Sequence, residues 1–251
     1  MDPKRVLLAV AGAALLAASL PTITEAQEGH EGFLLKQPRA SLGFHLGYAV
    51  AGASSEIFDF TRERLTVGDR AFDAPSVGGS LGIRVNPRWD VRLDLSYSRS
   101  EVSSEFRDWV DLDDLPIEQE TSFQRVPVTV GIQYYLKDRG RSVGRFAWVP
   151  SDWNAYVGVG GGATFYRFEQ VGDFVDFETL DIFADRFTDE GSALTGQAFA
   201  GAEVSLSPTF LLTAEGRYNL ADPAEMSGDF LGFEPMDLSG FEFVVGLSAR
   251  F

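Results

Sequence analysis

The strongest pattern in this chain is an alternation of apolar and polar side chains with a period of two, which predicts β-strands rather than helices. Residues 240–251 show it most clearly and read GFEFVVGLSARF. Phe241, Phe243, Val245, Leu247, Ala249 and Phe251 fall on one face of such a strand, and Glu242, Val244, Gly246, Ser248 and Arg250 fall on the other. One face is apolar and the other is mostly small or polar. The last strand of a soluble β-sandwich would also alternate, so this segment alone leaves two classes of fold open.

The same alternation recurs along the chain. The segments that carry it are residues 41–53, 76–86, 89–98, 123–137, 153–168, 194–206, 210–220 and 241–251. Each is long enough for a tilted bilayer crossing, which takes about 9–11 residues. Short Pro-containing connections at 87–88 and 207–209 alternate with much longer ones, as they do in outer-membrane barrels. We therefore predict an all-β fold, an eight-stranded antiparallel up-and-down transmembrane β-barrel with long acidic external loops.

One connection departs from this scheme. Residues 138–152 should form a short turn but do not, and they carry three arginines and Trp148. We expect an extended periplasmic turn that lies near the membrane surface.

The N-terminus has the layout of a secretory signal peptide. Lys4 and Arg5 precede an apolar run of 15 residues from Val6 to Leu20, and small residues follow up to Ala26. The run is shorter than the roughly 20 residues that a membrane-spanning helix needs. We predict a signal peptide at residues 1–26, a periplasmic segment at 27–40 and a barrel domain at 41–251. The chain has no cysteine, which excludes disulfides and thiol chemistry.

The net charge of the chain argues against one class of partner, and the charged residues on the inward faces indicate what fills the predicted barrel. A net charge of −16 argues against nucleic-acid binding, which needs clustered Lys and Arg. Ten charged side chains fall on the inward faces of the strands: Arg84, Asp90, Arg92, Asp94, Arg125, Glu203, Glu215, Arg217, Glu242 and Arg250. A barrel of this size is just wide enough to be filled by its own side chains. Five charges of each sign predict a paired network that plugs the barrel, and a narrow ion pathway is the alternative.

Other chemical signals are weak. Residues 158–163 match the dinucleotide pattern G-x-G-x-x-A, but a strand continues after them where that motif requires a helix. We expect these glycines to make room for large inward neighbours such as Phe199. With only His30 and His45 and no cysteine, we expect no metal site, no cofactor and no catalytic residues.

The predicted external loops combine acidic and aromatic residues. We expect them to pack on one another as a cap above the barrel, because they are too apolar for disordered tails. Their carboxylates could bind an extracellular ligand or divalent cations through oxygen ligands.

The signal peptide, the alternating strands and the GFEFVVGLSARF ending together resemble the small outer-membrane β-barrel family of OmpA-, OmpX- and OmpW-type proteins. The resemblance implies a location in the bacterial outer membrane, contact with its lipid and lipopolysaccharide, and recognition by the barrel-assembly machinery. The residues expected to form that assembly signal are Phe241, Phe243, Val245, Leu247 and Phe251. It also implies a non-enzymatic structural or surface-interaction role, or alternatively a narrow channel or lateral conduit for small or hydrophobic solutes. Because the sequence stops at the barrel, we expect no peptidoglycan-binding domain.

Overall fold

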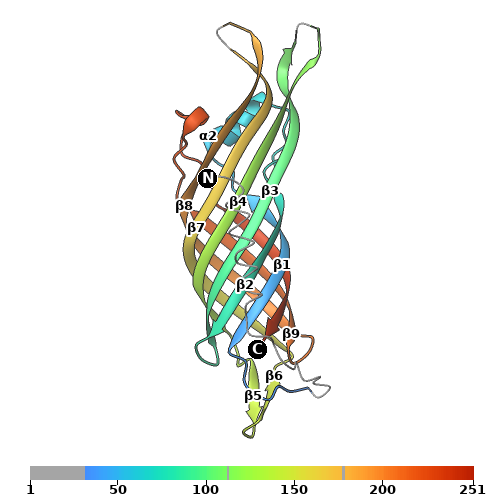
Figure 1. Ribbon diagram of the computed structural model, residues 1–251, viewed down its shortest axis with the longest axis vertical. Coiled ribbons are helices and arrows are strands. Elements are labelled where there is room, and N and C mark those ends of the chain that lie inside the picture. The colour runs from blue at the N-terminus through green and yellow to red at the C-terminus, as the bar shows by residue number, and fades with distance from the viewer. Residues whose placement is uncertain (1–31, 112, 177–178) are drawn as a thin grey trace.

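The computed structural model describes residues 32–111, 113–176 and 179–251, and most of them form a closed antiparallel barrel (Figure 1). Within these residues the ring runs in the order β1-β10-β9-β8-β7-β4-β3-β2. Its strands are β1 (Ala40–Ala51), β2 (Ala74–Arg84), β3 (Trp89–Val110), β4 (Pro116–Tyr135), β7 (Trp153–Val175), β8 (Ile182–Ser205), β9 (Phe210–Ala221) and β10 (Gly240–Arg250). Each predicted segment corresponds to one strand in chain order, so the predicted eight-stranded barrel is confirmed. The predicted signal peptide lies outside the described residues.

Pairing of the first strand with the last closes the ring. β1 and β10 pair from Ser41 opposite Arg250 to Ala51 opposite Gly240. Phe251 extends this contact, because its backbone N–H donates to the carbonyl of Ala40 at 2.9 Å. The barrel portion of the sheet therefore has no unpaired edge. A sheet in hydrocarbon requires this, because no water is present there to satisfy the backbone groups of an open edge.

The outer face of the barrel is apolar, as the alternation predicts. Leu46, Val130 and Phe243 are 59%, 55% and 60% exposed, whereas the inward side chains between such positions are mostly buried. This inside-out distribution is the reverse of a water-soluble sandwich. No helix in the described part of the chain is both long and apolar enough to cross a membrane.

Aromatic side chains gather near the two ends of the apolar band. Trp89 and Tyr134 pack across β3 and β4 with ring centroids 4.8 Å apart near the short-turn end. Tyr218 and Phe241 pack at 4.6 Å toward the other end. Rings at these heights are typical of the two membrane–water interfaces.

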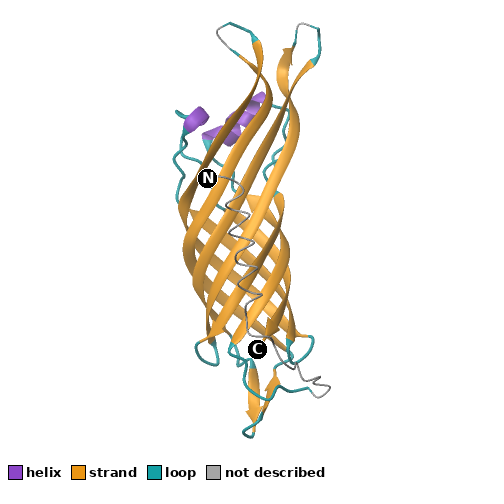
Figure 2. Cartoon of the chain, in the orientation of Figure 1, coloured by secondary structure: helices purple, strands orange, loops and turns teal. Residues whose placement is uncertain are grey.

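Two of the four predicted long loops are strands instead. β3 continues into β4, and β7 into β8, as long hairpins that rise beyond the barrel (Figures 1 and 2). Cross-strand pairing persists to Glu105 opposite Glu118 and to Val175 opposite Ile182. The prediction of long loops at residues 99–122 and 169–192 was therefore wrong. Above the apolar band the alternation of β4 continues with its polarity inverted, so that Glu118 and Glu120 point outward and Ile117 and Phe123 point inward.

The other two long connections pack over the outer mouth. Residues 52–73 contain helix α2 (Glu56–Arg64), and residues 222–239 contain the short 3₁₀ helix η1 (Gly228–Phe230). The helices lie beside the upper ends of the strands (Figure 2). We call the buried rings of Phe58, Phe72, Phe123, Phe168 and Phe230 the aromatic cluster. Phe58 from α2 is fully buried against Phe72 and Phe123, with centroids 4.6 and 5.2 Å away.

The connection between β4 and β7 forms its own small hairpin below the barrel. It consists of β5 (Gly140–Val143) and β6 (Ala147–Pro150) (Figure 1). Leu34 and Trp148 exchange two backbone hydrogen bonds of 2.8 Å, which tie the segment before β1 to this hairpin. The indole of Trp148 is 2% exposed. Trp148 is therefore buried against the end of the barrel, and the position of this extended turn relative to the membrane surface stays a prediction.

Because the outer face of the barrel is apolar, a charged side chain placed there should lower the stability of the protein, most strongly near the middle of the membrane. Leu93 pairs with Val130 midway between the aromatic ends, so Leu93→Arg should lower the free energy of unfolding in lipid vesicles by about 2–4 kcal/mol. Urea titration followed by tryptophan fluorescence measures this loss. Phe146→Arg is the control, because Phe146 is 76% exposed on the β5–β6 hairpin and should tolerate the same change. Equal effects at both positions would contradict a lipid-facing Leu93.

Candidate functional site: the barrel interior

A network of ion pairs crosses the middle of the barrel. Arg92 on β3 reaches Glu215 on β9 at 2.5 Å and Asp94 at 2.9 Å. Arg217 on β9 contacts Glu215 and lies 2.8 Å from Asp94 and 3.4 Å from Glu242. β3 and β9 lie on opposite sides of the ring, so these pairs span the lumen. We call these five side chains the central network.

His45 and Ser96 adjoin this network. Nε2 of His45 lies 3.2 Å from Nη1 of Arg217 and 3.2 Å from Oγ of Ser96, which lies 3.4 Å from Glu242. Because a guanidinium can only donate, Nε2 is the acceptor and the ring proton belongs on Nδ1. This grouping could not be foreseen from the sequence, since the side chains come from β1, β3, β9 and β10. His45 acts here as a hydrogen-bonded part of the filled interior.

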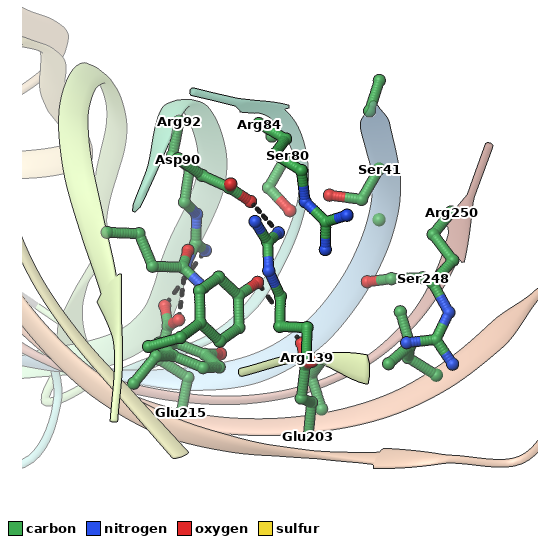
Figure 3. Close-up of a pocket in the computed structure, with 18 of the residues that line it drawn as sticks. Ser41, Ser80, Arg84, Asp90, Arg92, Arg139, Glu203, Glu215, Ser248 and Arg250 are labelled. Atoms are coloured by element: carbon green, nitrogen blue, oxygen red, sulfur yellow. Dashed lines mark hydrogen bonds and ion pairs between the residues drawn. The ribbon is translucent and has the colours of Figure 1, made fainter. Parts of the chain in front are cut away.

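Below the central network lies a cavity of about 60 Å³, which we call the lower chamber. Figure 3 shows Arg84, Arg139 and Arg250 reaching into the same space. Arg139 pairs with Asp90 at 2.6 Å and also donates to the carbonyl of Asn86 at 3.1 Å. Glu203 accepts a hydrogen bond of 3.4 Å from the Tyr135 hydroxyl. The chamber is therefore walled by both signs of charge.

Arg139 and Asp189 are interior charges that the strand pattern did not reveal. Arg139 comes from the β4–β7 connection rather than from an inward strand position, yet it is buried at 8% exposure. Asp189 lies on the part of β8 that was expected to be a loop, and it is 1% exposed. With both added, the interior holds six arginines and six carboxylates.

Arg125 stands apart above the central network. It is 7% exposed, its Cζ lies 5.2 Å from the ring of Phe123, and its Nη2 has no hydrogen-bond partner among the described residues. Oε1 of Glu242 likewise has none, and both residues line a cavity of about 20 Å³. A space of that size can hold a water molecule that would bridge polar atoms.

The glycines of the G-x-G-x-x-A sequence lie inside the continuous strand β7, not in a loop before a helix. A Cβ at Gly158 would collide with the ring of Phe199, so the prediction that glycine makes room for this side chain is confirmed there. In the described part of the chain, no group of three or more His, Cys, Asp or Glu side chains could hold a metal ion.

The side chains predicted to form the assembly signal lie on the outer face of the closing strand or just after it. Phe241, Phe243, Val245, Leu247 and Phe251 are 53%, 60%, 58%, 50% and 49% exposed. They are therefore accessible from outside the barrel.

The comparison with models of protein families agrees with this architecture. A family model described as outer membrane protein beta-barrel domain matches residues 7–251. Among solved structures, OprG from Pseudomonas aeruginosa is 15% identical, with 87% of this chain and 99% of that chain covered and a TM-score of 0.46. Ail, the attachment invasion locus protein of Yersinia pestis, is 14% identical, with 86% and 100% covered and a TM-score of 0.43. A major outer membrane protein from Thermus thermophilus is 12% identical, with 86% and 100% covered and a TM-score of 0.47. The search of curated proteins found no match.

The central network predicts a large cost for removing its central cation. Arg217→Met leaves Asp94, Glu215 and Glu242 buried with less positive charge around them. The free energy of unfolding in lipid vesicles should fall by about 3–5 kcal/mol. Arg88→Met is the control, because Arg88 forms an exposed pair with Asp138 and its loss should change little. If both variants unfold at the same urea concentration as the unmodified protein, the network does not stabilise the barrel.

Proposed function

The chain belongs to the outer membrane protein β-barrel domain family, and from that premise we propose that it is a closed surface barrel that presents a binding surface above the outer membrane. In this role the membrane part is a non-enzymatic, non-conducting scaffold. The strands that rise beyond the barrel make contact with molecules outside the cell. Residues 1–26 serve as the export signal, and β10 with Phe251 is read by the barrel-assembly machinery.

Three successive obstacles along the barrel axis support a closed interior. The aromatic cluster occupies the outer mouth, and its Phe58 and Phe168 are fully buried. The central network joins opposite walls through ion pairs. At the inner end, Arg139 lines the lower chamber and Trp148 packs against Arg84 and Arg250. A solute would have to displace all three groups, which is why we favour a scaffold over the alternative of a narrow conduit.

Uncompensated acidity on one hairpin supports a surface role and carries the proposal. On the outward face of β3 and β4, Glu105 lies directly opposite Glu118, and Glu120 lies nearby opposite Ser103. All three carboxylates are exposed. Like charges placed opposite each other destabilise a strand pair, so a cationic partner would relieve a cost built into this hairpin. On β7 and β8, by contrast, Glu169 is paired with Arg167 and Arg186.

The partner that fits this surface is cationic. A basic protein segment would pair with the three carboxylates directly. Divalent cations would serve the same purpose and could bridge the hairpin to the anionic lipopolysaccharide around the barrel.

The proposal of a closed scaffold predicts no conductance. Purified, folded protein in planar bilayers should give no reproducible current steps. A mock preparation from cells that lack the gene identifies steps due to contaminating porins. Discrete steps that appear only with this protein would favour the conduit instead.

The proposal of a cationic partner predicts that neutralising the carboxylates on the outward face of β3 and β4 selectively weakens the binding of a cationic probe. Glu105→Gln, Glu118→Gln and Glu120→Gln together should weaken the binding of an oligolysine probe to proteoliposomes several-fold. The control variant carries Glu63→Gln, Asp222→Asn and Glu225→Gln, which remove the same charge from other exposed positions near the outer mouth. Equal weakening in both variants would show a response to net charge alone and would contradict a specific surface.

A further inference from the structure

Toward the inner end of the lower chamber, the guanidinium groups of Arg84, Arg139 and Arg250 outnumber the carboxylates of Asp90 and Glu203 by one. Of the three arginines that enter it, Arg139 pairs with Asp90. Arg250 donates to neutral acceptors, the carbonyl of Pro208 at 2.7 Å and Oγ of Ser205 at 2.8 Å. Nε and Nη1 of Arg84 are shielded from solvent and have no hydrogen-bond partner among the described residues. Buried cationic donors without acceptors are costly unless something satisfies them.

Arg84 and Arg250 contact the same aromatic ring. Their Cζ atoms lie 5.6 and 5.3 Å from the ring of Trp148, which lies at the inner end of the barrel. Cation–π contact stabilises each guanidinium but leaves both charges in place. Two like charges at this end of the barrel create a positive potential that favours a nearby anion.

Hydroxyl groups complete this side of the chamber. Ser41, Ser80 and Ser248 line it together with Arg84 and Arg250 (Figure 3). Gly43 leaves room for two of them, because a Cβ at that position would lie 2.5 Å from Oγ of Ser248 and 2.9 Å from Oγ of Ser80. Ser41 lies directly opposite Arg250 in the pairing of β1 with β10. The lining therefore combines forked cationic donors with small neutral donors.

We propose that the lower chamber binds a phosphate-like oxyanion beside Arg84 and Arg250, with the hydroxyls of Ser41, Ser80 and Ser248 as further donors. Guanidinium forks match the oxygens of a tetrahedral oxyanion. The cavity of about 60 Å³ exceeds the roughly 10–15 Å³ that one water needs, so it has room for a group of several atoms. Oδ2 of Asp90 is paired with Arg139, Oδ1 of Asp90 has no hydrogen-bond partner among the described residues, and Glu203 accepts from the Tyr135 hydroxyl. This site does not depend on whether the barrel conducts or on what its outer surface binds.

The test is calorimetric titration of the full folded protein with inorganic phosphate, in a detergent without phosphate and at constant ionic strength. Saturable binding to one site is expected. Arg84→Gln should weaken it at least about tenfold, since it removes one of the two cations that line the site. Arg88→Gln is the matched control, because Arg88 is an exposed arginine at the same end of the barrel and should leave affinity unchanged.

A second variant keeps the proposal testable if Arg84→Gln fails to fold. Ser41→Asp places a permanent carboxylate opposite Arg250. It should abolish phosphate binding and raise the thermal midpoint in phosphate-free buffer. Undiminished binding to Ser41→Asp, or equal loss in Arg88→Gln, would overturn the proposal.

A parallel titration with a short-chain phosphatidic acid distinguishes the source of the anion. Saturable binding of both probes, or of inorganic phosphate alone, identifies a site for the free ion. Binding of the lipid alone, lost in Ser41→Asp, identifies a site for a headgroup with the same chemistry. If neither probe binds, the chamber is not an oxyanion site.

Discussion

Closure of the sheet between β1 and β10 is the contact on which the rest of this protein depends. In hydrocarbon no water is present to satisfy an unpaired backbone N–H or carbonyl, so an open sheet edge there would be prohibitive. The unbroken pairing from Ser41–Arg250 to Ala51–Gly240 removes that edge. Once the ring is closed, every side chain on its wall must face either lipid or the lumen, and the period-two alternation of the sequence follows from this choice.

Closure also determines what the interior must do. A ring of this size leaves a lumen that side chains can fill, and in this chain many of them are charged. Buried charges are costly unless they are paired. The central network pairs them by joining β3 to β9 across the lumen, so that Arg92 and Arg217 are surrounded by carboxylates. In the lower chamber the pairing is incomplete. Arg139 pairs with Asp90, and Nε and Nη1 of Arg84 have no acceptor among the described residues. The structure is therefore charge-matched at its middle and cationic near its inner end.

The alternation of apolar and polar residues predicted the strands, but it could not predict the fold of the connecting segments. The strands, their order and the outward apolar rows follow from positions such as Leu93 and Val130, because each residue must take one of two faces. Arg139 could not be placed this way, since a connecting segment has no such constraint and its fold depends on contacts such as Leu34 with Trp148. The long hairpins did leave a signal. In β4 the apolar side chain points outward at Val130 but inward at Phe123 and Ile117, and such an inversion marks where lipid gives way to water outside the barrel.

The most direct test of this account is site-directed spin labelling along residues 128–133 of β4 in liposomes, which the absence of cysteine in the chain makes straightforward. Accessibility to oxygen, which partitions into lipid, should alternate with a period of two and peak at Val130 and Ile132. Peaks at Thr129 and Gln133, or no alternation at all, would contradict a barrel that faces lipid with its apolar rows and encloses its charges.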